Sequence, residues 1–201
     1  MEFIKTLGEL RKLYGRVGEA ANRKVSDHLT PVYSQWITAS KFCVISTVGK
    51  NGTDGSPRGE DGPVVRIVDK KTLQMPDWRG NNRIDSLRNI IQDDRVSLMF
   101  MISGVKDVVR VNGNARLVKD EKLRQSFGHE GNSPTCIIQI SILEVYVHCP
   151  KSILRSQLWN IDETVKVPTI GEILAEVTQN KFVGEKFDLD LSERVKTTLW
   201  T

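Results

Sequence analysis

The sequence has few of the residues that build metal centres and disulfide frameworks. Its 201 residues include three cysteines and three histidines, and their spacing matches neither a zinc site nor a disulfide scaffold. No apolar run comes near the ~20 residues that are needed to cross a bilayer. The amino-terminal stretch carries charges throughout and does not resemble a signal peptide. We therefore expect no metal site, no membrane partner and a cytoplasmic protein.

The sequence also has no change in composition that would mark a domain boundary. Its hydrophobic fraction of 39% and charged fraction of 27% are ordinary for a globular domain with one core. We expect a single domain over residues 1–201, with a helical segment over about 1–38 and a helical extension over about 160–201. The net charge of +4 permits an anionic partner. Because Lys and Arg never form a solid basic block, a general nucleic-acid surface is a weak interpretation.

Apolar spacing predicts helices at both ends of the chain and strands in the middle. Spacings of three and four predict helix over the first ~30 residues and again over 32–39. β-rich apolar runs predict six strands, at 42–47, 63–69, 71–77, 95–102, 107–119 and 136–149. Further helices are expected at 83–92, 120–127, 150–159, 169–177 and 191–199. Since most strands follow one another through hairpins, the pattern predicts a mainly β fold, an antiparallel barrel with flanking helices.

Residues 48–59, VGKNGTDGSPRG, form a polar stretch between the first two predicted strands. Its Asn-Gly and Asp-Gly pairs are typical of turns, so the simplest interpretation is a polar hairpin loop. Ser56, Arg58 and Gly59 would then lie at or near the edge of a strand.

A second polar stretch, MPDWRGNNRIDSLRNI, joins a turn to the start of a predicted helix. The free N–H groups and the dipole of a helix N-terminus favour an anion such as phosphate. Arg83 can add a charged, bidentate hydrogen bond, and Asn81, Asn82 and Ser86 can donate to phosphate oxygens. An ordinary capped helix after a turn explains the same residues. The stretch alone leaves both interpretations open.

The order of three blocks, DGSPRG, TLQMPDWRGNNRIDSLRNIIQDDRVSLMF and VVRVNGNARLV, resembles the pyridoxamine 5′-phosphate oxidase-related family of FMN-binding split barrels. The resemblance covers roughly residues 25–160, and it implies a six-stranded antiparallel split β-barrel. It also implies a homodimer with two FMN sites along the interface. The FMN phosphate would contact Arg58 and Arg83, and Ser56, Pro57 and Gly59 would run along the isoalloxazine edge.

The resemblance therefore supplies a set of candidate cofactor-binding residues. Those in the two polar stretches are Ser56, Pro57, Arg58, Gly59, Asp77, Asn81, Asn82, Arg83 and Ser86. Those expected from the partner subunit are His148, Lys151, Arg155 and Trp159. No catalytic residue is assigned, because no acid or base pairs with His148 and Cys149 by spacing.

The chain departs in two places from the oxidase that gives this family its name. That enzyme has a Ser-Arg-Lys turn where this chain has Asn81-Asn82-Arg83, and its carboxyl-terminal Trp…Arg-x-His substrate motif is absent from the ending TTLWT. The resemblance thus implies an FMN-dependent oxidoreductase of the wider family, with an unknown substrate. No GxGxxG follows a strand, so a reductant such as NAD(P)H would dock only transiently.

Two other functions stay open on the sequence. The first is a non-catalytic flavin- or haem-binding sensor or storage protein of the same fold. The second is a nucleic-acid-binding barrel, which the pI of about 9.0 favours. The chain lacks the strand-borne aromatic pairs that stack bases, so we expect no nucleic-acid partner.

Overall fold

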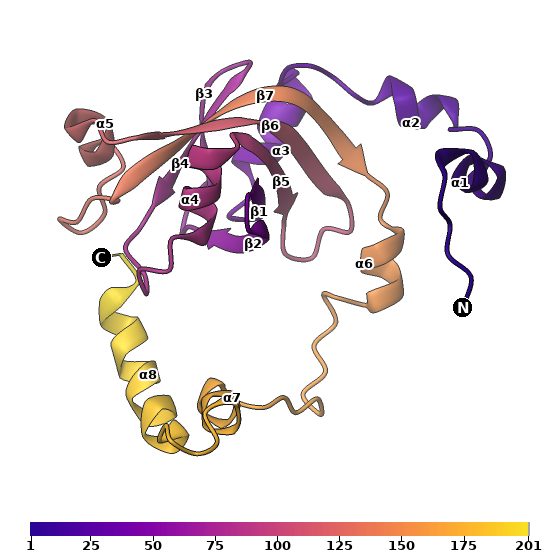
Figure 1. The fold of residues 1–201 in the computed structure, drawn as a ribbon. Coiled ribbons are helices and arrows are strands. Elements are labelled where there is room, and N and C mark those ends of the chain that lie inside the picture. Colours follow the sequence, from indigo (N-terminus) through magenta and orange to yellow (C-terminus); the bar gives the residue numbers. More distant parts are fainter. Residues whose placement is uncertain (201) are drawn as a thin grey trace.

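The computed structural model describes residues 1–200, and its centre is a seven-stranded sheet (Figure 1). The strands are β1 (Phe42–Gly49), β2 (Gly52–Gly59), β3 (Arg66–Asp69), β4 (Thr72–Asp77), β5 (Arg95–Met101), β6 (Val108–Val118) and β7 (Cys136–His148). Their order is β2-β1-β5-β6-β7-β4-β3, and every neighbouring pair is antiparallel. The mainly β, antiparallel architecture that the sequence predicted is therefore confirmed.

The expected number of strands was wrong, because the polar residues 52–59 form strand β2. This strand pairs with β1 along its whole length, from Phe42 opposite Gly59 to Gly49 opposite Gly52. Its turn-forming residues, none of which is fully buried, concealed it from the sequence analysis. The outer strands β2 and β3 do not pair with each other in the described residues, so the sheet is open and is not a closed six-stranded barrel.

Helices flank the sheet and extend from it. They are α1 (Leu7–Tyr14), α2 (Glu19–Arg23), α3 (Pro31–Thr38), α4 (Asp85–Gln92), α5 (Glu121–Gln125), α6 (Lys151–Ser156), α7 (Ile170–Val177) and α8 (Gly184–Thr198). Thr169 and Glu172 form a capping box at the start of α7. Helix α8 starts at Gly184, well before the predicted residue 191. At this start, Gly184 lies so close to Gly171 that a Cβ atom on either residue would overlap the backbone of the other.

The core lies against the inner faces of the central strands. Side chains alternate along β1, so Cys43 and Ile45 are fully buried while their neighbours are half-buried or exposed. Phe100 of β5 joins them, and helices α3 and α4 add Ile37 and Ile90 to the same cluster. Helix α4 thereby packs against β1 and β2, which fixes its first turn beside the outer strand.

The carboxyl-terminal helices form an arm that leaves the sheet and returns to it. After α6 the chain runs away from the sheet to α7, and α8 packs against α7 (Figure 1). The end of α8 comes back beside the loop between β4 and α4, where the label C lies (Figure 1). Within residues 1–200, none of the helices has both the length and the apolar character required to span a bilayer.

Candidate functional site

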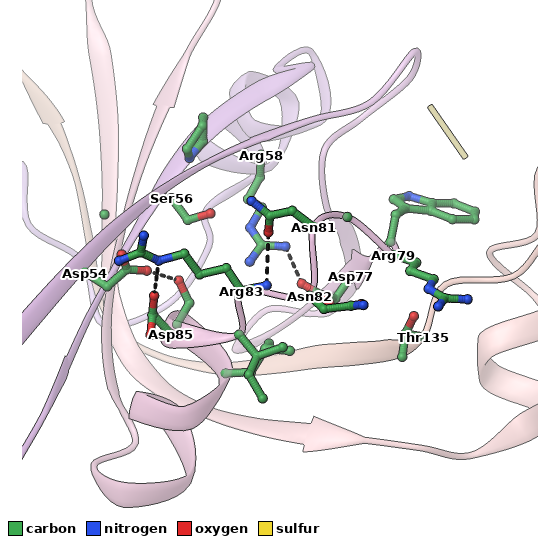
Figure 2. Close-up of a pocket in the computed structure, with 17 residues that line it drawn as sticks. Asp54, Ser56, Arg58, Asp77, Arg79, Asn81, Asn82, Arg83, Asp85 and Thr135 are labelled. Atoms are coloured by element: carbon green, nitrogen blue, oxygen red, sulfur yellow. Dashed lines mark hydrogen bonds and ion pairs between the residues drawn. The ribbon is translucent and has the colours of Figure 1, made fainter. Parts of the chain in front are cut away.

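A cavity of about 660 Å³ lies between β2, the end of β4 and the start of α4 (Figure 2). Its volume is within the range of sites that hold small molecules and cofactors. The residues that line it are Asp54, Gly55, Ser56, Pro57, Arg58, Asp77, Trp78, Arg79, Gly80, Asn81, Asn82, Arg83, Ile84, Asp85, Ser86, Leu87 and Thr135. The cavity therefore unites the two polar stretches that the sequence singled out.

Strand β2 supplies one wall of the cavity. Its pairing with β1 holds it extended, so that Asp54, Ser56 and Arg58 lie on one face at alternate positions. These three residues are half-buried, whereas Gly55 and Pro57 between them are exposed. The other wall begins where β4 ends, at Asp77, which β4 places by pairing with β7.

Arg58 and Asp77 form an ion pair across the cavity (Figure 2). Both side chains are largely buried, with exposed fractions of 18% and 11%. The Nε atom of Arg58 is also buried, and it has no hydrogen-bond partner among the described residues. A buried donor without an acceptor is energetically costly, so this N–H group fits an acceptor supplied by a ligand.

Arg83 lies at the opposite end of the cavity and is exposed. Its Nε donates to the Asp85 carboxylate at 2.6 Å, and its backbone N–H donates to Oδ1 of Asn81 at 3.0 Å (Figure 2). The hydrogen bond from Arg83 lowers the pKa of Asp85 and raises the pKa of Arg83. Asn82 has a φ of 59°, in the left-handed region that Asn tolerates better than most residues. This turn directs Arg83 back along the start of α4.

The first turn of α4 has no side-chain cap. Its N-cap residue is Ile84, which makes no side-chain hydrogen bond to the helix. Ile84, Asp85, Ser86 and Leu87 all line the cavity, so the start of the helix faces it. The side-chain cap of an ordinary capped helix start is absent from the described residues, so N–H groups of this turn are available to an anion.

Ser86 and Asp54 form a second polar contact inside the cavity. Ser86 is buried, and its hydroxyl donates to the Asp54 carboxylate (Figure 2). The hydroxyl proton is therefore already used, and Ser86 can donate to a ligand only when this contact breaks.

Formal charges cancel within the lining. Three carboxylates (Asp54, Asp77 and Asp85) face three guanidinium groups (Arg58, Arg79 and Arg83). Arg79 is exposed and makes no ion pair with any described residue. In the ligand-free chain, Asp77 thus pairs with Arg58 and Asp85 pairs with Arg83.

Most of the predicted residues of the two stretches meet in the cavity. Those that line it are Ser56, Pro57, Arg58, Asp77, Asn81, Asn82, Arg83 and Ser86. Gly59 does not line it, because it lies at the end of β2 opposite Phe42.

The residues predicted to come from a partner subunit lie elsewhere in the same chain. His148 ends β7, and Lys151 and Arg155 belong to α6, which lies away from α4 and β4 (Figure 1). The indole of Trp159 donates to the Val105 carbonyl at 2.7 Å. Their role in a site shared with a second chain stays a prediction.

Several lining residues carry little or no signal in the sequence. Asp54 is found by the alternation along β2, once that segment is recognised as a strand. Asp85 lies in the first turn of α4, where an acidic residue is common and carries no specific signal. Thr135 has no local signal at all, because the pairing of β4 with β7 brings it to Asp77, whose carbonyl accepts its N–H at 2.8 Å.

Residues 29–149 match the family model described as pyridoxamine 5′-phosphate oxidase, and this range contains every residue that lines the cavity. No curated protein matches the chain.

Among solved structures, the chain is similar to HupZ of Group A Streptococcus, with 18% identity, a TM-score of 0.47 and coverage of 58% of this chain and 91% of that one. It is similar to General Stress Protein 26 of Bacillus anthracis, with 17% identity, a TM-score of 0.44 and coverage of 57% and 88%. It is also similar to an FMN-binding protein of Syntrophomonas wolfei, with 14% identity, a TM-score of 0.44 and coverage of 71% and 97%.

Proposed function

The chain belongs to the pyridoxamine 5′-phosphate oxidase family, and on this basis we propose that it binds FMN in the cavity between β2 and α4 and acts as an FMN-dependent oxidoreductase. The observation that carries the proposal is the convergence of Arg58, Arg83 and an uncapped helix start on one cavity of cofactor size. A ligand such as FMN matches this cavity, because its phosphate would bind at the charged end and its planar ring would lie along the edge of β2.

The phosphate would bind at the start of α4. The N–H groups of the first turn and the Arg83 guanidinium both favour a dianion there. Arg83 is held by Asp85 in the ligand-free chain, but its side chain is 81% exposed. A surface ion pair of this kind is weak, so exchanging Asp85 for a phosphate oxygen costs little.

Arg58 provides a second, more rigid contact. Its ion pair with Asp77 fixes the guanidinium, while the buried Nε still lacks an acceptor. An oxygen of the phosphate or of the ribityl chain would satisfy this donor. A guanidinium that is already immobilised loses little side-chain entropy when it binds.

The ring would lie along β2 toward Trp78. Strand β2 is an outer strand that pairs only with β1 in the described sheet, so its other edge carries N–H and C=O groups free to bond a ligand. Such groups suit the polar edge of an isoalloxazine. The Trp78 indole, which also lines the cavity, would pack against the same ring.

A second copy of the chain would complete the site. Residues 79–84 form one rim of the cavity, and all of them are exposed in the isolated chain. A homodimer would cover this rim, and His148, Lys151, Arg155 and Trp159 of the second copy are the candidates for contact with the flavin. The protein residues would bind and orient the cofactor, which supplies the redox chemistry itself.

A non-catalytic flavin-binding protein is the second candidate, and one observation favours it. The described residues that line the cavity include no His, Cys, Tyr or Lys. Within one chain, the lining therefore offers no side chain that exchanges protons near neutral pH. The same lining lacks the usual axial ligands of haem, so one chain alone would not hold haem in this cavity.

Anaerobic reduction separates the two candidates. The protein would be loaded with FMN and mixed with NADH or NADPH, and the flavin absorbance would be followed before and after oxygen is admitted. An oxidoreductase loses the oxidised-flavin absorbance within seconds to minutes and regains it with oxygen. A storage or sensor protein keeps its absorbance with both nicotinamides, and this result would contradict the catalytic proposal.

A further inference from the structure

The end of the carboxyl-terminal arm reaches the wall of the cavity. Helix α8 has 15 residues, and so a length of roughly 22 Å, which carries the chain back toward the loop after β4 (Figure 1). Beyond its last turn, the Trp200 ring lies edge-on to Trp78, with a centroid distance of 5.4 Å and an interplanar angle of 78°. Trp78 is itself a lining residue of the cavity.

A second ring holds Trp200 from another side. The His129 ring, in the loop before β7, lies 4.4 Å from the Trp200 ring with an angle of 38°. Trp200 is half-buried although most of the arm's last turn is exposed. Its ring thus fills the space between two segments of the sheet domain that are far apart in sequence.

The Trp78 indole is held at two points as a result. Its Nε1 donates to the Glu60 carboxylate at 2.9 Å, and its ring makes an edge-to-face contact with the Trp200 ring. The hydrogen bond fixes the Nε1 end of the indole. The contact with Trp200 restrains the ring itself, since an aromatic pair prefers a defined edge-to-face geometry.

We propose that Trp200 is a positioning residue of the flavin site, which holds the Trp78 indole against the ring end of the cavity and shields the bound isoalloxazine from solvent. This inference rests on the proposed function. It gives the arm a role that differs from that of Arg83, because Trp200 acts at the ring end of the cavity and Arg83 acts at the phosphate end.

The different location gives the proposal a specific signature. Losing Trp200 weakens FMN and riboflavin by the same factor, about threefold to tenfold, because both ligands carry the same ring. Losing Arg83 weakens FMN alone, because only FMN carries the phosphate. The accessibility of the bound flavin to iodide, a solvent-borne quencher of flavin fluorescence, should rise severalfold without Trp200.

The experiment compares Trp200→Ala, Trp200→Phe and Leu199→Ala in the full chain, with wild type alongside. Leu199 is the matched control, because it precedes Trp200 and its side chain is 60% exposed. Each protein is titrated with FMN and with riboflavin, and iodide quenching is measured on the FMN complex. We expect Trp200→Ala to lose affinity for both ligands and to admit iodide, Trp200→Phe to recover much of both properties, and Leu199→Ala to match wild type.

Three results would be read separately. Unchanged affinity and iodide accessibility in Trp200→Ala would overturn the positioning role while leaving FMN binding intact. A loss confined to FMN would also overturn it, because it would place Trp200 at the phosphate end. If wild type binds neither flavin, the proposed function itself fails.

Discussion

Replacing Arg83 by alanine should weaken FMN without disturbing the fold. The Arg83 side chain is 81% exposed, and its half-buried partner Asp85 keeps a second ion pair with Arg88, so the ligand-free protein should keep its unfolding temperature within about 2 °C. In the complex the guanidinium would make one or two charged hydrogen bonds to the phosphate. The high exposure reduces their strength, and we expect FMN affinity to fall roughly 10- to 100-fold.

Riboflavin and a matched arginine provide the controls for this prediction. Riboflavin lacks the phosphate, so Arg83→Ala should leave its affinity unchanged, and Arg83→Lys should restore part of the FMN affinity because it keeps the charge. Arg88 of α4 also pairs with Asp85, at a distance of 3.2 Å, but it does not line the cavity. Arg88→Ala should therefore bind FMN as wild type does. Flavin fluorescence titrations measure all of these affinities. If Arg83→Ala binds FMN as tightly as wild type, the phosphate does not lie at the start of α4.

Three further predictions address the neighbouring charges and the second subunit. Arg58→Ala should weaken FMN binding. It should also lower the free energy of unfolding of the ligand-free protein by about 1–3 kcal/mol, because Asp77 is left largely buried and unpaired. Urea unfolding measures this loss, and an unchanged midpoint would contradict the role of the buried ion pair. Asp85→Asn should bind FMN severalfold more tightly, since it removes the carboxylate that competes with phosphate for Arg83; weaker binding in the same titration would contradict that competition. Sedimentation equilibrium should give a species of twice 22.7 kDa, and a monomer that binds one FMN would refute the shared site.

The sequence identified the two polar stretches of the cavity but not their physical relation. Hydrophobic patterning predicted most strands, and the helix that contains Ser86 was predicted close to its true position. That Arg58 and Arg83 belong together came from the family resemblance, because their meeting depends on how β2 and α4 both pack on β1. No spacing rule contains that information.

The errors have physical causes that a sequence pattern does not show. Strand β2 consists of Gly, Asp, Ser and Pro residues that normally form turns, and it is extended because it pairs with β1 over eight residues. The sequence carries no signal for the contact between Trp200 and Trp78, because this contact depends on the path of the whole arm. Such long-range contacts are set by tertiary packing, which overrides local preference.

The most direct test of the central claim is the visible absorption spectrum of the protein after incubation with FMN and removal of the free ligand by gel filtration. The account predicts the two visible bands of oxidised flavin, in the proportion of one FMN for each chain. A colourless protein after this treatment, or a spectrum with the Soret band of haem, would contradict it.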